Sequence, residues 1–368
     1  MQGYNLIYIC DYAAMYSGNF IPSLSALAAK AAEHNNVYFL FPEQAKGIHW
    51  LKNLNMDPDH ILFCDFYPVN IYKFCKQLSA RLPDAPVVVH THFVDRLCLL
   101  GIRLVFPKHI FHYHMSTPER KGLDKKIKRI ARNLIALDSI IIGVSKAVAE
   151  NLKTFYPFND CIYIPNAVAF DQLEQFSANR PLHDYIERDS FSALIHGTNF
   201  FVKGTDIAIR AVEELNQEER CNCTLYITTN NIPETTKTVS ETCGNCKNIR
   251  IIDVVEDVKN LYDSVDLFLS PSRQDAGPYS ILESSYSDCQ VVVSDIPGPD
   301  GMKDIPGILW VESEDVEGLK KAILTAYANK QQGIVSDINA MQKKYVVENY
   351  NVSRWVEQNM EVYNRYFP

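Results

Sequence analysis

Long apolar segments, a basic leader and internal repeats are all missing from this sequence of 368 residues. No apolar stretch reaches the ~18–20 residues that a membrane-spanning helix needs. The first residues, MQGYNLIYIC, run directly into a strand-like segment, without the basic start of a signal peptide. Neither a low-complexity tract nor a short-period repeat is present. We therefore expect a globular, cytoplasmic protein.

A disulfide framework is not expected either, although the sequence has 10 cysteines. Several fall within strand-like runs, which suits buried, reduced thiols: Cys10, Cys64, Cys98 and Cys161. Four others form a CxC and a CxxC pattern about 20 residues apart, a spacing that zinc sites use: Cys221, Cys223, Cys243 and Cys246. Both pairs precede strand-like runs, so we expect them at the sheet edge opposite the one that binds ligands. Free thiols are the expectation, with a structural zinc ion as the alternative.

Positive charge is scarce overall but unevenly distributed. The formal net charge is −8. Residues 1–170 hold 18 Lys/Arg against 13 Asp/Glu, a balance of +5, whereas residues 171–368 hold 18 against 31, a balance of −13. The first half can therefore face an anionic surface or substrate, and nucleic-acid binding by the whole protein is not expected.

Two series of short apolar, β-branched or aromatic runs predict two sheets. The first series is NLIYIC, VYFLF, HILFC, VVVHTHF, HIFHYHM, SIIIGVS and CIYIP. The second is ALIHG, TLYIT, NIRIID, LFLSPS, QVVVSD and ILWV. Most runs are separated by segments long enough for crossover helices, which is typical of a parallel sheet covered on both faces. We therefore predict an α/β protein with two Rossmann-like domains, over residues 1–168 and 190–351.

The segments outside these two series also carry predictions. From Ala167 to about Asp189 the pattern lapses into mixed polar sequence, which we interpret as a hinge or linker. Residues 352–368 predict an amphipathic helix with Ser353 as a candidate cap. Its apolar face is formed by Val356, Met360, Tyr363 and Phe367.

The most informative stretch is residues 267–283, LFLSPSRQDAGPYSILE. Its apolar start predicts a buried strand, and Gly277 and Pro278 precede a segment that can begin a helix. Asp275 and Glu283 then flank a helix N-terminus at the sheet edge where α/β proteins bind ligands. A helix N-terminus attracts phosphate, and Glu283 can accept hydrogen bonds from a ribose diol. The arrangement suits a nucleotide-sugar.

This stretch resembles the carboxylate-x7-carboxylate signature of retaining GT-B glycosyltransferases, specifically glycosyltransferase family 4 (glycosyl transferases group 1). Other segments resemble family segments in family order, so the likeness covers nearly the whole chain: IIIGVSKAVAENL, YIPNAV, HGTNFFVKGTDIAIRAV and the last helix. The resemblance implies two Rossmann-like domains whose parallel sheets face a central cleft, the first for the acceptor and the second for the donor. It also implies that helix 352–368 returns to the first domain.

The resemblance further implies site residues. Donor binding would fall to Gly197, Thr198, Lys203, Gly277, Pro278, Tyr279 and Glu283, with Glu283 on the ribose hydroxyls. Catalysis would fall to His114, Lys203 and Asp275, where Lys203 is the counter-charge for a leaving diphosphate. His92 would lie near the acceptor. Independently of the resemblance, Gly18 follows the first strand-like run and could let a phosphate or an acceptor hydroxyl approach the backbone, with a plain turn as the alternative. The donor is expected to be linked to UDP or GDP, and neither a metal ion nor a cofactor is expected.

Two positions depart from the family pattern. The family commonly has Glu where this chain has Asp275, so this carboxylate is one methylene shorter. Many members have an arginine where this chain has Thr198, which removes one cation from the donor site. Either the grip on the donor is weaker, or Arg273 or Asn199 compensates.

Four histidines occupy the ends of two predicted strands: His90, His92, His112 and His114. Strand alternation places the two members of each pair on one face of the sheet. His114 has three interpretations, namely contact with the donor sugar, a hydrogen-bonded core histidine, or a metal ligand. Metal is the least favoured, because no carboxylate lies at ligand-like spacing nearby.

A basic segment, ERKGLDKKIKRIARNLIAL, predicts an amphipathic helix in the first half. Its cations are Lys125, Lys126, Lys128, Arg129 and Arg132. This face could contact anionic lipid at the inner side of the cell membrane or a charged glycan, and a solvated basic face is the alternative.

The expected function is transfer of a hexosyl unit to a glycan or lipid-linked glycan in cell-surface polysaccharide synthesis. Two alternatives of other kinds stay open: a nucleotide-sugar epimerase of the same fold, and a catalytically silent sugar-nucleotide-binding module. Thr198 and Asp275 motivate the second alternative.

Overall fold

The computed structural model describes residues 3–114, 136–178, 183–187, 189–244 and 246–367. The chain forms two compact units. Met1–Ala167 and Val352–Pro368 make the N-terminal unit, and Val168–Asn351 makes the C-terminal unit. Each unit is described by itself.

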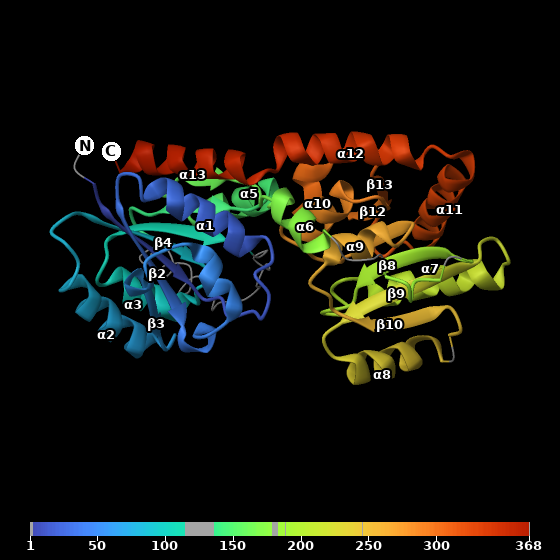
Figure 1. The fold of residues 1–368 in the computed structure, drawn as a ribbon, viewed down its shortest axis with the longest axis horizontal. Coiled ribbons are helices and arrows are strands. Elements are labelled where there is room, and N and C mark those ends of the chain that lie inside the picture. The colour runs from blue at the N-terminus through green and yellow to red at the C-terminus, as the bar shows by residue number, and fades with distance from the viewer. Residues whose placement is uncertain (1–2, 115–135, 179–182, 188, 245, 368) are drawn as a thin grey trace. The chain divides into compact units, whose positions relative to one another are not determined.

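A parallel sheet of seven strands forms the centre of the N-terminal unit (Figure 1). Its strands lie in the order β3-β2-β1-β4-β5-β6-β7, so the strand order reverses between β1 and β4. The bounds are β1 (Asn5–Cys10), β2 (Asn36–Pro42), β3 (Ile61–Cys64), β4 (Val87–His92), β5 (Lys108–Tyr113), β6 (Ile140–Gly143) and β7 (Cys161–Tyr163).

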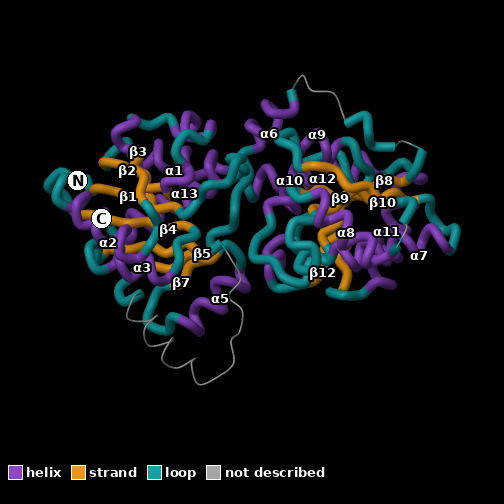
Figure 2. The backbone as a smooth tube through the Cα atoms, turned by 90° about the horizontal axis from the view of Figure 1, so that it is seen from below, coloured by secondary structure: helices purple, strands orange, loops and turns teal. Residues whose placement is uncertain are grey.

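Helices cover both faces of this sheet, as Figure 2 shows. They are α1 (Phe20–Ala31), α2 (Pro68–Ser79), α3 (Arg96–Arg103), α5 (Lys146–Phe155) and α13 (Val352–Tyr366), with short 3-10 helices η1 (Glu43–Ala45), η2 (His49–Leu54) and η3 (Pro58–His60). Alternation along β1 supplies both faces: Leu6 and Tyr8 pack with α1 and α13, while Ile7 packs with α2 and α3. The predicted helix at the end of the chain is thus α13, but Ser353 lies inside it and is not its cap.

The C-terminal unit has a parallel sheet of six strands in the order β10-β9-β8-β11-β12-β13. Its order reverses between β8 and β11. The bounds are β8 (Phe191–His196), β9 (Cys223–Thr229), β10 (Ile249–Asp253), β11 (Leu267–Ser270), β12 (Gln290–Asp295) and β13 (Leu309–Glu312).

Seven α-helices and one 3-10 helix belong to the described part of this unit: α6 (Phe170–Ser177), α7 (Thr205–Gln217), α8 (Ile232–Cys243), α9 (Val258–Asp263), α10 (Tyr279–Tyr286), α11 (Val316–Gln332), α12 (Val335–Asn349) and η4 (Gly298–Met302). Alternation along β8 again divides the core. Ala193 and Ile195 pack with α7 and α11, while Leu194 packs with α9 and α10.

These observations confirm the predicted α/β class with two parallel Rossmann-like sheets, since each strand-like run of the sequence is a strand. The expected linker is wrong in part, because it contains α6. Phe170 and Leu173 of α6 are buried in the C-terminal core, and the ring of Phe170 lies 4.5 Å from that of Tyr286. Their three-residue spacing puts both on one helix face, which mixed polar sequence around them conceals.

We expect acid to destabilise the N-terminal unit first. Burial lowers the pKa of His90 and of His109 to about 3, and those of His92 and His112 well below the usual value. In the unfolded chain these rings titrate near pH ~6.5. The unfolded state then binds more protons below that pH, so the free energy of unfolding falls as pH falls.

In the described C-terminal unit, burial lowers the pKa of His196 to about 4. Hydrogen exchange can be followed by mass spectrometry at pH 7.5 and at pH 5.0 and corrected for intrinsic rates. Between these two pH values, the protection factors of the N-terminal sheet should fall at least ~10-fold more than those of the C-terminal sheet, which corresponds to ~1.4 kcal/mol in the free energy of opening. Equal loss in the two sheets would contradict this account.

Candidate functional site

The carboxyl ends of β8 and β11 meet where the strand order of the C-terminal sheet reverses. Open α/β sheets bind ligands at such a point. The segments that follow these two strands contain the predicted catalytic residue Asp275 and most of the residues predicted to bind the donor: Gly197, Thr198, Lys203, Gly277 and Pro278. The structure therefore brings these positions to one edge of one sheet.

The loop after β8 turns sharply before α7. Gly204 precedes α7 with φ 71°, in the left-handed region that glycine adopts without steric cost. A Cβ atom there would lie 2.0 Å from the carbonyl oxygen of Pro271, so this loop lies directly against the segment after β11. Gly197 is buried and its N–H donates to the carbonyl of Thr228 at 2.8 Å, whereas Thr198 is exposed.

An ion pair joins the two loops. Lys203 Nζ donates to Asp275 Oδ2 at 2.6 Å, and the two side chains are 30% and 14% exposed. Asp275 Oδ1 accepts the N–H of Ala276 at 2.8 Å, which fixes the orientation of the carboxylate. The pair thus holds one cation and one carboxylate at the sheet edge, just before α10.

Glu283 belongs to a chain of hydrogen bonds that reaches into the core. The hydroxyl of Tyr262, which is fully buried, donates to Glu283 Oε2 at 3.4 Å. The same hydroxyl is 2.7 Å from Nε2 of His196, whose Nδ1 is 2.7 Å from Oγ1 of Thr228. Burial, and then the charge of Lys203, lower the pKa of His196. A neutral imidazole therefore connects β9 to the carboxylate on α10.

The start of α10 lies directly beside these groups. Its N-cap Pro278 provides no side-chain cap, and both Gly277 and Pro278 are buried. Tyr279 is the first helical residue and is half-buried, and Glu283 follows one turn later. Gly298 supports this turn from η4, because a Cβ atom on it would lie 2.2 Å from the carbonyl oxygen of Asp275.

Two carboxylates engage Arg273, one of the two candidates to replace the cation that Thr198 removes. Its Nη1 and Nη2 donate to the two oxygens of Asp206 at 2.7 and 2.9 Å, and its Nε donates to Glu314 at 2.9 Å. Hydrogen bonding to Asp206 raises the pKa of Arg273 above its usual value. A buried aspartate in the first turn of α7 therefore engages the guanidinium in a structural role. The alternative at Asn199, which is exposed, stays open.

The reversal point of the N-terminal sheet gathers the other predicted residues. His92 is the last residue of β4 and is fully buried, and its Nδ1 is 2.9 Å from Nε2 of His114. The ring of Phe20, the first residue of α1, lies 5.1 Å from His92 and 5.6 Å from His114. Gly18 lies in the exposed turn before α1. The three predicted positions thus share one edge of this sheet.

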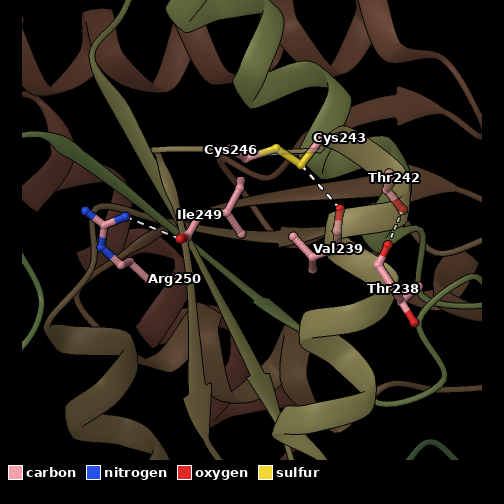
Figure 3. The surroundings of a disulfide bond; sticks show 7 residues. All are labelled: Thr238, Val239, Thr242, Cys243, Cys246, Ile249 and Arg250. Carbon is pink, nitrogen blue, oxygen red and sulfur yellow. Dashed lines mark hydrogen bonds between the residues drawn. A yellow bond between two sulfur atoms is a disulfide. The ribbon is translucent and has the colours of Figure 1, made fainter.

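The expectation of free thiols is wrong for one cysteine pair. Cys243 and Cys246 form a disulfide (Figure 3). Helix α8 ends at Cys243 and Gly244 follows with φ 72°, so the chain turns back and the two Cα atoms lie 6.0 Å apart. Cys221 and Cys223 are free and buried. Among the described residues these four cysteines form no metal-ligand group, which removes the support for zinc here.

The predicted basic helix, with Lys125, Lys126, Lys128, Arg129 and Arg132, lies outside the described residues. Of the helices that the structure describes, none combines the length and the hydropathy needed to span a bilayer.

Comparison with known proteins relates part of the chain to a known family. Residues 192–329 match the family model described as Glycosyl transferases group 1. These residues contain β8, β11 and α10 together with their loops, so the match coincides with the site described above. A search of curated proteins found no match to this sequence.

Solved structures show the same fold over nearly the whole chain. A glycosyltransferase from Rickettsia africae ESF-5 has a TM-score of 0.77 at 18% identity, covering 100% of this chain and 99% of that one. Anabaena HepE, solved with UDP and glucose, has a TM-score of 0.76 at 12% identity, covering 98% and 100%. Sucrose-phosphate synthase from Thermosynechococcus elongatus has a TM-score of 0.73 at 14% identity, covering 99% of each. The resemblance to group 1 glycosyltransferases with the GT-B fold is confirmed.

Three residues of this site were not identified from the sequence. Tyr262 and His196 lie in different segments from Glu283 and meet it through tertiary structure. Gly298 contacts Asp275 across the loop after β12. The position of His196 at a strand end, immediately before Gly197, is a local signal that could have identified it. The sequence around Tyr262 and Gly298 contains no such signal.

A double-mutant cycle should test the connection behind Glu283. Tyr262→Phe should lower the free energy of unfolding by ~1–3 kcal/mol, because Nε2 of half-buried His196 loses its partner. His196→Leu should also destabilise the protein. In the His196→Leu background, Tyr262→Phe should lower the free energy of unfolding by at least ~1 kcal/mol less than it does in the native protein. Urea denaturation of the four proteins measures this coupling. Additive effects would mean that the two side chains do not act together.

Proposed function

We propose that this chain transfers a hexosyl unit from a UDP- or GDP-linked sugar to a glycan or lipid-linked glycan, with retention at the anomeric carbon. One observation carries the proposal. The Lys203–Asp275 pair and the Tyr262–Glu283 pair converge at the strand-order reversal of the C-terminal sheet, within the region that matches group 1 glycosyltransferases. The structure of HepE with UDP and glucose adds support for a nucleotide-sugar as the ligand of this fold.

In the proposed complex, the C-terminal unit binds the donor. Glu283 accepts hydrogen bonds from the ribose hydroxyls, and its contact with Tyr262 limits the directions available to the carboxylate. Gly197 and Gly277 allow the diphosphate to approach the backbone, and the N-terminal end of α10 provides a positive field. Thr198, Pro278 and Tyr279 line the same edge, and Asp275 faces the sugar.

Lys203 has the main electrostatic role in the proposed reaction. As the bond between the anomeric carbon and the diphosphate oxygen breaks, negative charge grows on that oxygen, and a nearby ammonium stabilises it. The same oxygen takes the proton of the acceptor hydroxyl, which attacks the same face of the sugar. Lys203 and the helix N-terminus thus provide the positive charge, and we propose transfer without a metal ion or a cofactor.

The remaining roles rest on sequence resemblance and on location in the N-terminal unit. We propose that Gly18 and His92 bind the acceptor and that His114 contacts the donor sugar. The excess of +5 in residues 1–170 favours an anionic neighbour. We propose a cytoplasmic protein with peripheral contact to anionic membrane through its basic segment, acting in cell-surface polysaccharide synthesis.

A catalytically silent sugar-nucleotide-binding module is the second candidate. Two observations favour it: Thr198 contributes no cation, and Arg273 is engaged by Asp206 and Glu314. The transfer proposal thus depends on the charge of Lys203.

Incubation with a panel of UDP- and GDP-sugars tests the function. Free nucleotide should appear, and appear faster when acceptor glycans are added. Glu283→Gln should weaken nucleotide binding about 10-fold, or ~1.4 kcal/mol by calorimetry, because a charged acceptor is lost. The exposed Glu348→Gln is the matched control. Sugar conversion without acceptor would instead indicate an epimerase, and binding without turnover a silent module.

Lys203→Met should lower kcat about 100-fold and change KM little, because the negative charge that Lys203 stabilises develops on the diphosphate oxygen only in the transition state. The double variant Lys203→Met/Asp275→Asn tests the structural part of the loss, since Asp275 also faces the sugar and its removal is not expected to raise turnover. Removing both charges should restore the melting temperature, since no half-buried carboxylate is left unpaired, but it should not restore turnover. Recovery of turnover in the double variant would reduce Lys203 to a structural partner of Asp275. Lys237→Met, on the exposed face of α8, is the control.

A further inference from the structure

Three histidines converge inside the N-terminal unit. His90 and His92 lie on β4, and His112 lies on β5, directly opposite His92 in the strand register. One ring nitrogen of each lies within 4.8 Å of the others. The three side chains are buried, with exposures of 0%, 0% and 4%. A search of the described residues for three or more potential metal ligands that lie close together finds this group.

The hydrogen bonds of these rings leave two nitrogens unused. His90 Nδ1 is 2.7 Å from the hydroxyl of Tyr363 on α13, and His90 Nε2 is 3.3 Å from His112 Nδ1. The Nε2 atoms of His92 and His112 are buried without a hydrogen-bond partner. A polar atom that is buried without a hydrogen-bond partner costs ~1–3 kcal/mol of stability. Two such atoms side by side therefore favour a bound ligand that engages both.

The rings are also in the protonation state that binds metals. Burial lowers the pKa of His90 to about 3 and those of His92 and His112 well below the usual value. At neutral pH each ring is therefore uncharged and carries one lone pair on nitrogen, which is the form that coordinates an ion.

We propose that His90, His92 and His112 form a binding site for a transition-metal ion of the Zn²⁺ class. The set offers imidazole nitrogen and no carboxylate, which suits Zn²⁺, Co²⁺ or Ni²⁺ and disfavours Mg²⁺ and Ca²⁺. Tyr363 holds the far nitrogen of His90, as second-shell groups hold metal-ligating histidines. His114, 2.9 Å from His92, or a water molecule would complete a tetrahedral set.

The geometry requires a modest contraction. Zn–N bonds of ~2.0–2.1 Å in a tetrahedral site put ligand nitrogens roughly 3.3 Å apart. The observed upper limit of 4.8 Å is about 1.5 Å longer, which ring rotation within the cluster can close. This ion is not assigned to the transfer chemistry at Lys203. His92 and His114 also have roles in the proposed function, so the test below measures metal binding itself and not transfer.

Titration of the whole untagged protein, stripped with a chelator, tests the site directly. Co²⁺ should bind at about one ion per chain with the visible absorption of tetrahedral nitrogen coordination, Zn²⁺ should displace it, and either ion should raise the melting temperature. Mg²⁺ and Ca²⁺ should do neither. Absence of Co²⁺ binding to the native protein would overturn the proposal, as would a thiolate-to-cobalt charge-transfer band, which would place the ion on cysteine.

Two variants locate the ion. His112→Asn should reduce Co²⁺ affinity at least 100-fold, whereas the control His60→Asn, at the end of η3, should leave it unchanged. Unchanged affinity in a folded His112→Asn protein would overturn the assignment. If that variant does not fold, Tyr363→Phe decides. It keeps the aromatic packing but removes the partner of His90, and should weaken Co²⁺ binding ~10–100-fold.

Discussion

Each sheet reverses its strand order once, and this constraint places both candidate sites. Each pair of parallel strands is joined by a crossover helix that packs on one face of the sheet. Where the strand order reverses, the helices that follow two neighbouring strands pack on opposite faces, and a crevice opens at the carboxyl ends of these two strands. In the C-terminal sheet the reversal separates β8 from β11, and in the N-terminal sheet it separates β1 from β4. Lys203 meets Asp275 at the first point, and His92 meets His114 at the second. Chemistry-bearing side chains are distant in sequence but adjacent because of strand order.

The two reversal points differ in how their polar groups are stabilised. The C-terminal point uses formal charges in two ion pairs whose cations are equally exposed, but Asp206 of the Arg273 pair is more deeply buried than Asp275 of the Lys203 pair. The deeper pair holds the loops together, while the shallower pair stays accessible to a competing anion. The N-terminal point uses uncharged imidazoles stacked between strands, such as His90 and His112 with ring centroids 5.4 Å apart. Neutral rings tolerate burial that a carboxylate would not.

Periodic features were predictable from the sequence, and tertiary encounters were not. The strand-like runs became strands because hydrophobic alternation is local, and Glu283 was placed through the strand–loop–helix order around it. The pairing of Arg273 with Asp206 could not be predicted, because Asp206 lies on α7, 67 residues away in the sequence. Tyr262 was missed for the same reason. The Cys243–Cys246 bond depends on a turn at Gly244 that the CxxC spacing permits but does not require.

The return of α13 to the N-terminal unit makes the C-terminal unit an insertion within it. The chain leaves the first unit after Ala167 and re-enters it at Val352. Trp355 and Tyr363 of α13 fill the core against α1, so the core of the first unit lacks two large side chains until the last residues exist. During synthesis on the ribosome the inserted unit is complete first, and the unit that begins the chain closes last. Removal of α13 would therefore damage the core formed by residues 5–167, which are distant from it in the sequence.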